Sequence, residues 1–257
     1  MAKRRTEPRS RAAVAALPRR ALGSLPLPSR RSLAIGLGLI ALAGGAYAVA
    51  RETSAFAIRH VEVVGGSPLL RAHVRKELVS LRGTNLLGLD GSALERRVAA
   101  MPAVVSATYD RSFPHTLRIT IVPETPVAVL HRGTQTWLVS ARARVIARLV
   151  PGARPLLPRI WVPTAAPVTV GDFLVPEYGG TAARTLGLVQ HFPARIATAT
   201  LAHDELTFAL RSGVEIRFGA PMDIRLKLAI ARRALRVLPA GTTYLDVSVP
   251  GRPVAGH

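Results

Sequence analysis

The chain has 257 residues, with 35 Lys and Arg against 15 Asp and Glu, and a formal net charge of +20. The basic residues are spread along the whole chain, which argues against a dedicated nucleic-acid-binding motif. Cysteine is absent, which excludes disulfides and Cys-ligated metal sites, so ordinary hydrophobic cores must hold the fold.

Residues 32–50 run for nineteen residues without a charge. A helix of this length spans roughly 28 Å, close to the hydrocarbon thickness of a bilayer. The preceding residues 1–31 carry nine Lys and Arg against the single acid Glu7. The positive-inside rule therefore predicts a cytoplasmic tail over 1–31, a transmembrane helix over 32–50 and an exported remainder. That remainder keeps an excess of basic residues, which suits anionic lipid, cell-wall polymers or acidic proteins as partners.

A cleaved export signal is the alternative interpretation of this segment. Residues 29–33 (SRRSL) resemble a twin-arginine signal, and residues 46–48 (AYA) offer small residues for cleavage. Against cleavage, the apolar stretch exceeds the usual 7 to 15 residues of a signal peptide, and the basic lead is long. These features favour an uncleaved anchor.

The next segment predicts a compact β-α-α-β-β unit. Alternation and apolar spacing give strands over 56–64, 105–109 and 117–121, and helices over 68–81 and 90–101. Ser67 with Pro68 supplies an N-cap and a proline at the first helical position, and Asp90 can cap the second helix. Ile119 should be buried, because it alternates with Arg118 and Thr120, and Phe113 is expected to cover core.

This unit resembles a POTRA domain, specifically that of the FtsQ/DivIB family of bacterial cell-division proteins. The resemblance rests on residues 61–65 (VEVVG), 101–107 (MPAVVSA), 111–117 (RSFPHTL) and 123–128 (PETPVA). Ala103 and Thr125 depart from the family pattern, where an aromatic residue and an arginine are usual. The resemblance implies a POTRA domain over 56–126, with these residues in structural roles.

From residue 127 onward the pattern predicts a second, β-rich domain with flanking helices over 127–250, followed by a tail over 251–257. Strands are expected at 127–131, 135–140, 144–149, 205–210, 214–218 and 243–249, with helices at 181–191 and 221–238 and a proline-rich crossing at 151–167. The fold class is therefore α+β, with an N-terminal transmembrane helix.

The last predicted strand is expected to be an edge strand, because nothing long enough to pair with it follows. Its residues are Thr243, Tyr244, Leu245, Asp246, Val247, Ser248 and Val249. The family resemblance implies that the partner FtsB/DivIC adds a strand there, and that FtsL and the septal synthase complex are further partners. Arg225, Arg232 and Arg236 lie off the apolar stripe of the preceding helix and are candidates to attract an acidic partner segment. Ser140, Ser248 and Val249 depart from the family pattern, which puts contacts through those side chains in doubt.

The sequence holds no recognised catalytic motif. Residues 203–205 (HDE) are the one cluster of histidine with acids, and a loop between strands explains them as well as a metal or acid-base site does. We therefore expect a non-enzymatic membrane scaffold without cofactor, metal, nucleic acid or small-molecule substrate. The alternatives are a POTRA-bearing transport or outer-membrane assembly factor and an exported envelope enzyme.

Overall fold

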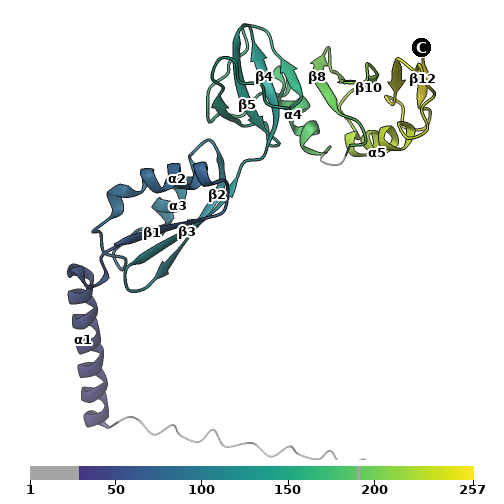
Figure 1. The fold of residues 1–257 in the computed structure, drawn as a ribbon. Helices are drawn as coiled ribbons and strands as arrows, with labels where there is room; N and C mark the ends of the chain where they lie inside the picture. The colour runs from purple at the N-terminus through teal and green to yellow at the C-terminus, as the bar shows by residue number, and fades with distance from the viewer. Residues whose placement is uncertain (1–28, 190–191) are drawn as a thin grey trace, which may run out of the picture. The chain divides into compact units, whose positions relative to one another are not determined.

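A computed structural model describes residues 29–189 and 192–257 of the protein, so the predicted cytoplasmic tail lies outside the described residues except for its last three. Helix α1 (Arg30–Glu52) includes the whole uncharged stretch. It is the one helix, within the described ranges, that is long and apolar enough to cross a membrane. The predicted α+β class is confirmed, with this helix followed by a POTRA-type region and a β-rich region with helices (Figure 1).

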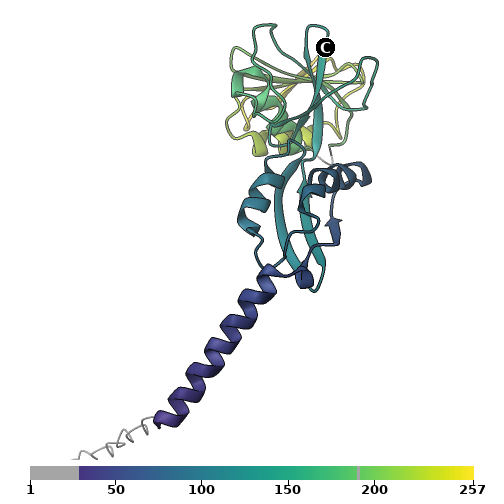
Figure 2. The ribbon, with the colours of Figure 1, turned by 90° about the vertical axis from the view of Figure 1, so that its left-hand side faces the viewer.

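The POTRA-type region follows the predicted β-α-α-β-β order. Strands β1 (His60–Val64), β2 (Val104–Ser112) and β3 (Thr116–Pro123) form a sheet in the order β1-β3-β2, with β1 parallel to β3 and β2 antiparallel to it. Helices α2 (Pro68–Glu77) and α3 (Gly91–Ala99) lie beside this sheet (Figure 2). Helix α2 stops four residues before the predicted end at Leu81, and a short 3-10 turn (Val79–Leu81) follows it.

Both predicted helix caps are confirmed. The Ser67 hydroxyl accepts a hydrogen bond from the Leu70 N–H at 3.2 Å, and the Asp90 carboxylate accepts one from the Ala93 N–H at 3.0 Å. The Ala93 N–H also lowers the pKa of Asp90, because the hydrogen bond favours the charged carboxylate. A side-chain acceptor at these positions satisfies a backbone donor that the helix itself leaves unpaired.

The POTRA core lies between the two helices and one face of the sheet. Val74, Leu94 and Val98 from the helices pack with alternate residues of β3, including Leu117 and Ile119. Ile119 is 1% exposed, as its alternation predicts. The expectation for Phe113 was wrong: this side chain is 52% exposed at the β2–β3 turn. It packs edge-to-face on Phe56, with ring centroids 5.7 Å apart, because the turn carries it beyond the end of the sheet.

The β-rich region is built on one mixed sheet of nine strands in the order β12-β11-β10-β9-β8-β7-β4-β5-β6. Its strands are β4 (Pro126–Arg132), β5 (Gln135–Ser140), β6 (Val145–Arg148), β7 (Arg159–Trp161), β8 (Ile196–Ala202), β9 (Glu205–Leu210), β10 (Glu215–Gly219), β11 (Tyr244–Asp246) and β12 (Val254–Gly256). The sequence predicted six of them and missed β7, β8 and β12.

Helices α4 (Gly180–Gly187) and α5 (Ile224–Ala234) join the same hydrophobic core as this sheet. Leu186 of α4 and Leu228 and Ala231 of α5 are buried, and Ile224 and Leu235 pack against them. The predicted apolar stripe of the last helix is therefore confirmed. The helix itself is shorter than the predicted 221–238, because a left-handed Asp223 precedes its first turn.

The first testable prediction concerns the POTRA core at Ile119. An unpaired carboxylate there must stay protonated or force the core open, so Ile119→Asp should lower the free energy of unfolding by roughly 4 kcal/mol or more. Thr120→Asp, one residue along β3 on the exposed face, should change it by less than about 0.5 kcal/mol. Thermal unfolding of both variants followed by circular dichroism measures the difference, and equal melting temperatures would contradict the register.

Candidate protein interface

The β9–β10 hairpin forms the base on which the last two strands are built. Phe208 and Phe218 are fully buried, and their rings meet edge-to-face with centroids 4.9 Å apart. These rings come from opposite strands at alternating positions, so they fix the register of the hairpin. The β9–β10 hairpin is therefore part of the hydrophobic core.

Strand β11 adds to this base in parallel with β10. Glu215 N–H donates to Thr243 O at 2.9 Å, and Val247 N–H donates to Arg217 O at 2.8 Å. Leu245 and Val247 are buried in the domain core. The backbone groups of residues 243–247 that face β10 are therefore already hydrogen-bonded within the sheet.

The prediction that residues 243–249 form the sheet edge was wrong by one strand. Residues 250–253 turn the chain back, and Val254–Gly256 pair antiparallel with Tyr244–Asp246 as β12. The segment expected as a tail thus supplies the last strand. Three residues suffice because the turn, closed by the Arg252 N–H on Val249 O at 3.0 Å, brings them directly alongside β11.

The two edges of the nine-stranded sheet differ. Along β6, the Val145 N–H donates to Asp172 O at 2.9 Å, and the Gly171 N–H donates to Val145 O at 2.8 Å. A segment around 171–174 thus covers the beginning of that edge. No strand among the described residues pairs with the outer side of β12, which makes β12 the open edge of this sheet.

The Tyr244 side chain of β11 packs against Gly256 of β12. A Cβ built on Gly256 would lie 2.6 Å from the Tyr244 hydroxyl oxygen, so the ring occupies the space that a side chain would need. The Arg217 guanidinium lies over the Tyr244 ring, 4.8 Å from its centroid, and its Nε donates to Glu215 Oε1 at 2.7 Å. The hydrogen bond and charge of Glu215 raise the pKa of Arg217. Glycine at 256 is therefore a packing requirement.

The other polar residues of the predicted strand have local roles. The Asp246 carboxylate accepts the Ser248 N–H at 2.8 Å, which closes a tight turn after β11. Thr243 and Val249 are exposed, and Ser248 is half-buried. Asp246 is therefore engaged within its own strand end.

Lys227 is a structural residue that sequence reasoning assigned no role. It is 5% exposed, and its ammonium group donates to Phe218 O at 2.9 Å and Ala220 O at 2.7 Å. These bonds attach α5 to the end of β10. Its position beside Leu228 on the buried side of the helix was the available signal, because a lysine there must find buried acceptors.

The three candidate arginines of the last helix are not equivalent. Arg225 and Arg236 are exposed, while Arg232 is half-buried and donates to Leu188 O at 3.2 Å. Arg232 thus helps to pack α5 against the end of α4. Arg225 and Arg236 remain available to a charged partner.

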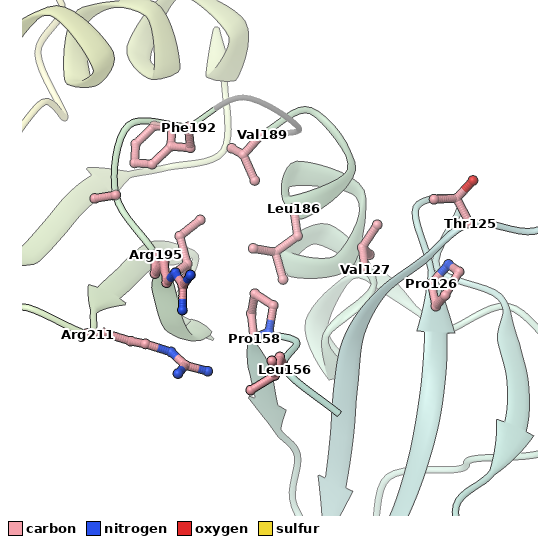
Figure 3. A pocket seen from close by; sticks show the side chains of 12 residues that line it. Thr125, Pro126, Val127, Leu156, Pro158, Leu186, Val189, Phe192, Arg195 and Arg211 are labelled. Carbon is pink, nitrogen blue, oxygen red and sulfur yellow. The ribbon is translucent and has the colours of Figure 1, made fainter. Parts of the chain in front are cut away.

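A separate hollow of about 500 Å³ lies beside the beginning of β4 and the end of α4. Figure 3 shows Arg195 and Arg211 on one side and apolar side chains, including Leu186 and Pro158, on the other. The described residues that line it contribute no carboxylate, thiol or imidazole. The described lining residues therefore provide no acid-base pair.

The cluster at 203–205 is a hairpin turn. His203 and Asp204 join β8 to β9 with positive φ angles of 50° and 60°, typical of a two-residue turn between antiparallel strands. Within residues 29–189 and 192–257, no group of three or more His, Asp or Glu side chains is placed to hold a metal ion.

Comparisons with known proteins agree with these features. Residues 56–122 match the family described as POTRA domain, FtsQ-type. The cell division protein FtsQ of Streptomyces venezuelae is 26% identical over 236 residues, covering 89% of this chain and 85% of that protein. FtsQ of Streptomyces collinus is 26% identical over 230 residues, covering 84% of each chain, and FtsQ of Mycolicibacterium smegmatis is 29% identical over 228 residues, covering 86% of this chain and 61% of that protein.

The buried lysine gives the second prediction. Lys227→Met keeps the length of the side chain but leaves the Phe218 and Ala220 carbonyls without their donor, which should cost about 1–3 kcal/mol of unfolding free energy. Arg225→Met on the exposed side of the same helix should change it by less than about 0.5 kcal/mol. Urea unfolding followed by the fluorescence of the buried Trp137, which shares this core, measures both variants. Equal midpoints would show that the two bonds contribute no net stability.

Proposed function

The chain resembles the FtsQ/DivIB cell-division proteins over most of its length and carries their type of POTRA domain, and from this premise we propose that it is a non-enzymatic scaffold of the bacterial divisome. It links membrane-anchored division proteins at the septum and helps to control septal peptidoglycan synthesis. The proposed partners are FtsB/DivIC, FtsL and, through them, the septal synthase complex. The role is binding, since the sequence offers no recognised catalytic motif.

The open edge of β12 is the observation that carries this proposal. An uncovered edge presents unpaired N–H and C=O groups, and an extended segment of a partner can add there as a further strand. The start of the opposite edge, at Ala143 and Val145, is already occupied by the protein's own 171–174 segment. Residues 243–249 then act as the support of the interface, because β12 lies between them and the partner.

Charge on the neighbouring helix suits an acidic partner segment. Arg225 and Arg236 are exposed on and just after α5, and no acidic side chain in the described residues lies within salt-bridge distance of either. Such exposed charges mainly accelerate encounter and orient the partner, while the backbone bonds of the added strand supply affinity.

The proposed location is the cytoplasmic membrane, with α1 as a single span, the N-terminus in the cytoplasm and the POTRA and β-rich regions outside. The charge asymmetry around α1 supports this orientation, because basic segments stay on the cytoplasmic side. The structure of α1 itself is compatible with either orientation.

Topology gives the third prediction. Alkaline phosphatase fused to the C-terminus should be active and should remain in the membrane fraction, because the enzyme folds only outside the cytoplasm and α1 retains the chain. The fractionated fusion is assayed for activity and size. A soluble product trimmed near Ala48 would show instead that the apolar segment is a cleaved export signal.

The β12 edge gives the fourth prediction. Since the natural chain has no cysteine, a single Ala255→Cys on exposed β12, carrying a thiol-attached photocrosslinker, should crosslink to FtsB/DivIC in dividing cells, whereas the same probe on exposed Arg148→Cys, in β6 at the other end of the sheet order, should not. Gly256→Val should weaken this crosslink several-fold, because Tyr244 must move to admit the side chain. Gly251→Val is the matched control, since nothing lies within 4 Å of its Cβ position. Wild-type crosslinking by a folded Gly256→Val variant, or equal crosslinking at Arg148→Cys, would place the interface elsewhere.

A further inference from the structure

Three chain segments meet at one end of the POTRA domain: residues 54–59, 82–86 and 112–116. None of them takes part in the partner interface proposed above. The hydrogen bonds that join them run from Ile58 N to Thr84 O (2.9 Å), from Leu86 N to Phe56 O (2.9 Å) and from Arg59 N to His115 O (2.9 Å). We call this end the POTRA base. Because backbone bonds hold all three segments, the base is an ordered part of the domain.

The POTRA base is tied to the end of the membrane helix. The Asn85 side-chain amide donates to Ala50 O and to Thr53 O, both at 2.8 Å. Ala50 is the last residue of the uncharged stretch, and the last turn of α1 from Val49 belongs to the same compact unit as the POTRA domain. A buried or membrane-facing helix end needs partners for its last carbonyls, and here a POTRA side chain supplies them.

Chain length independently limits how far the base can lie from the bilayer. Phe56 lies six positions after Ala50, so even a fully extended chain places Phe56 within roughly 20 Å of the end of the apolar span. The Phe113 ring packs on Phe56 with centroids 5.7 Å apart. The half-exposed Phe113 is therefore held near the membrane surface.

The chemistry of the base matches a lipid interface. Arg51 at the end of α1 and Arg59 and Arg82 of the base are exposed, and the one acid among residues 51–59, 82–86 and 112–116 is Glu52. Basic side chains close to a membrane attract anionic head groups, and an exposed aromatic ring favours the region between head groups and acyl chains. Phe113 and the three arginines thus combine an apolar side chain with positive charge next to a membrane span.

We propose that the POTRA base is a second membrane contact, which binds anionic phospholipid head groups through Arg51, Arg59 and Arg82 and inserts Phe113 into the interfacial region. This contact is separate from the β12 edge, and it requires only that α1 spans the membrane. Together with the chain connection to α1, this lipid contact holds the POTRA domain at the membrane surface.

The test uses the full chain, which naturally lacks cysteine, reconstituted in vesicles of phosphatidylcholine alone or mixed with phosphatidylglycerol. A polarity-sensitive fluorophore is attached to Phe113→Cys, and quenching by nitroxide-labelled lipid is measured. Leu69→Cys is the matched control, because Leu69 is an apolar side chain 84% exposed in the same domain, beyond the other end of β1. Quenching should be roughly twofold or more stronger at position 113 than at 69, and stronger with phosphatidylglycerol present.

Charge reversal separates head-group binding from simple proximity. Arg59→Glu with Arg82→Glu should abolish the dependence on phosphatidylglycerol, whereas Arg75→Glu with Lys76→Glu, the same charge change on exposed α2, should preserve it. Should Phe113→Cys fail to fold by circular dichroism, Ala55→Cys on the exposed part of the base carries the label instead. Equal quenching at the base and at position 69, or equal values in the two lipids, in a chain still retained in the vesicles would overturn this proposal while leaving the anchor intact.

Discussion

The unpaired backbone at the edges of an open sheet is the constraint on which the β-rich region depends. A sheet that does not close must leave two edges, and each exposes N–H and C=O groups that pair readily with any extended chain. The protein treats its two edges differently, because the 171–174 segment bonds to Val145 along β6 while β12 stays open. The β12 edge is therefore the fully unpaired edge of the described sheet, and it is the one proposed above to bind a partner strand.

The POTRA domain works under a different constraint, which comes from the end of the apolar helix. The carbonyls of a final helical turn lack partners within the helix, and Asn85 satisfies Ala50 O and also holds Thr53 O. One amide thus connects the anchor to the loop that carries Leu86 into the POTRA core. Changes at this amide should therefore affect both the helix end and the domain next to it.

The sequence predicted those elements that have a clear local signal. The strand around Phe208 has a long alternation of inward and outward side chains, and the helix after Ser67 has an N-cap residue. The missed strands lack such patterns. Strand β8 (Ile196–Ala202) is made of Ala and Thr beside one Ile and one Leu, and a register shift between Ile196 and Thr198 breaks its period of two. Strands β7 and β12 have three residues each, so only their tertiary pairing defines them. The candidate interface was therefore placed one strand too far inside, and Lys227 was missed because its acceptors are backbone carbonyls distant in sequence.

The residues that differ from the family pattern after Asp246 belong to the turns that lead from β11 to β12. The family's Arg-Tyr pair is replaced by Ser248 and Val249, of which the first donates its N–H to the Asp246 carboxylate and the second accepts the Arg252 N–H through its carbonyl oxygen. Both positions thus serve the sheet that supports β12. An added strand bonds mainly to the main chain, which is the same for every sequence, so specificity must come from side chains beside the edge. Three exposed side chains could give a partner such specificity: Val254 on β12, Arg225 on α5 and Arg236 just after α5.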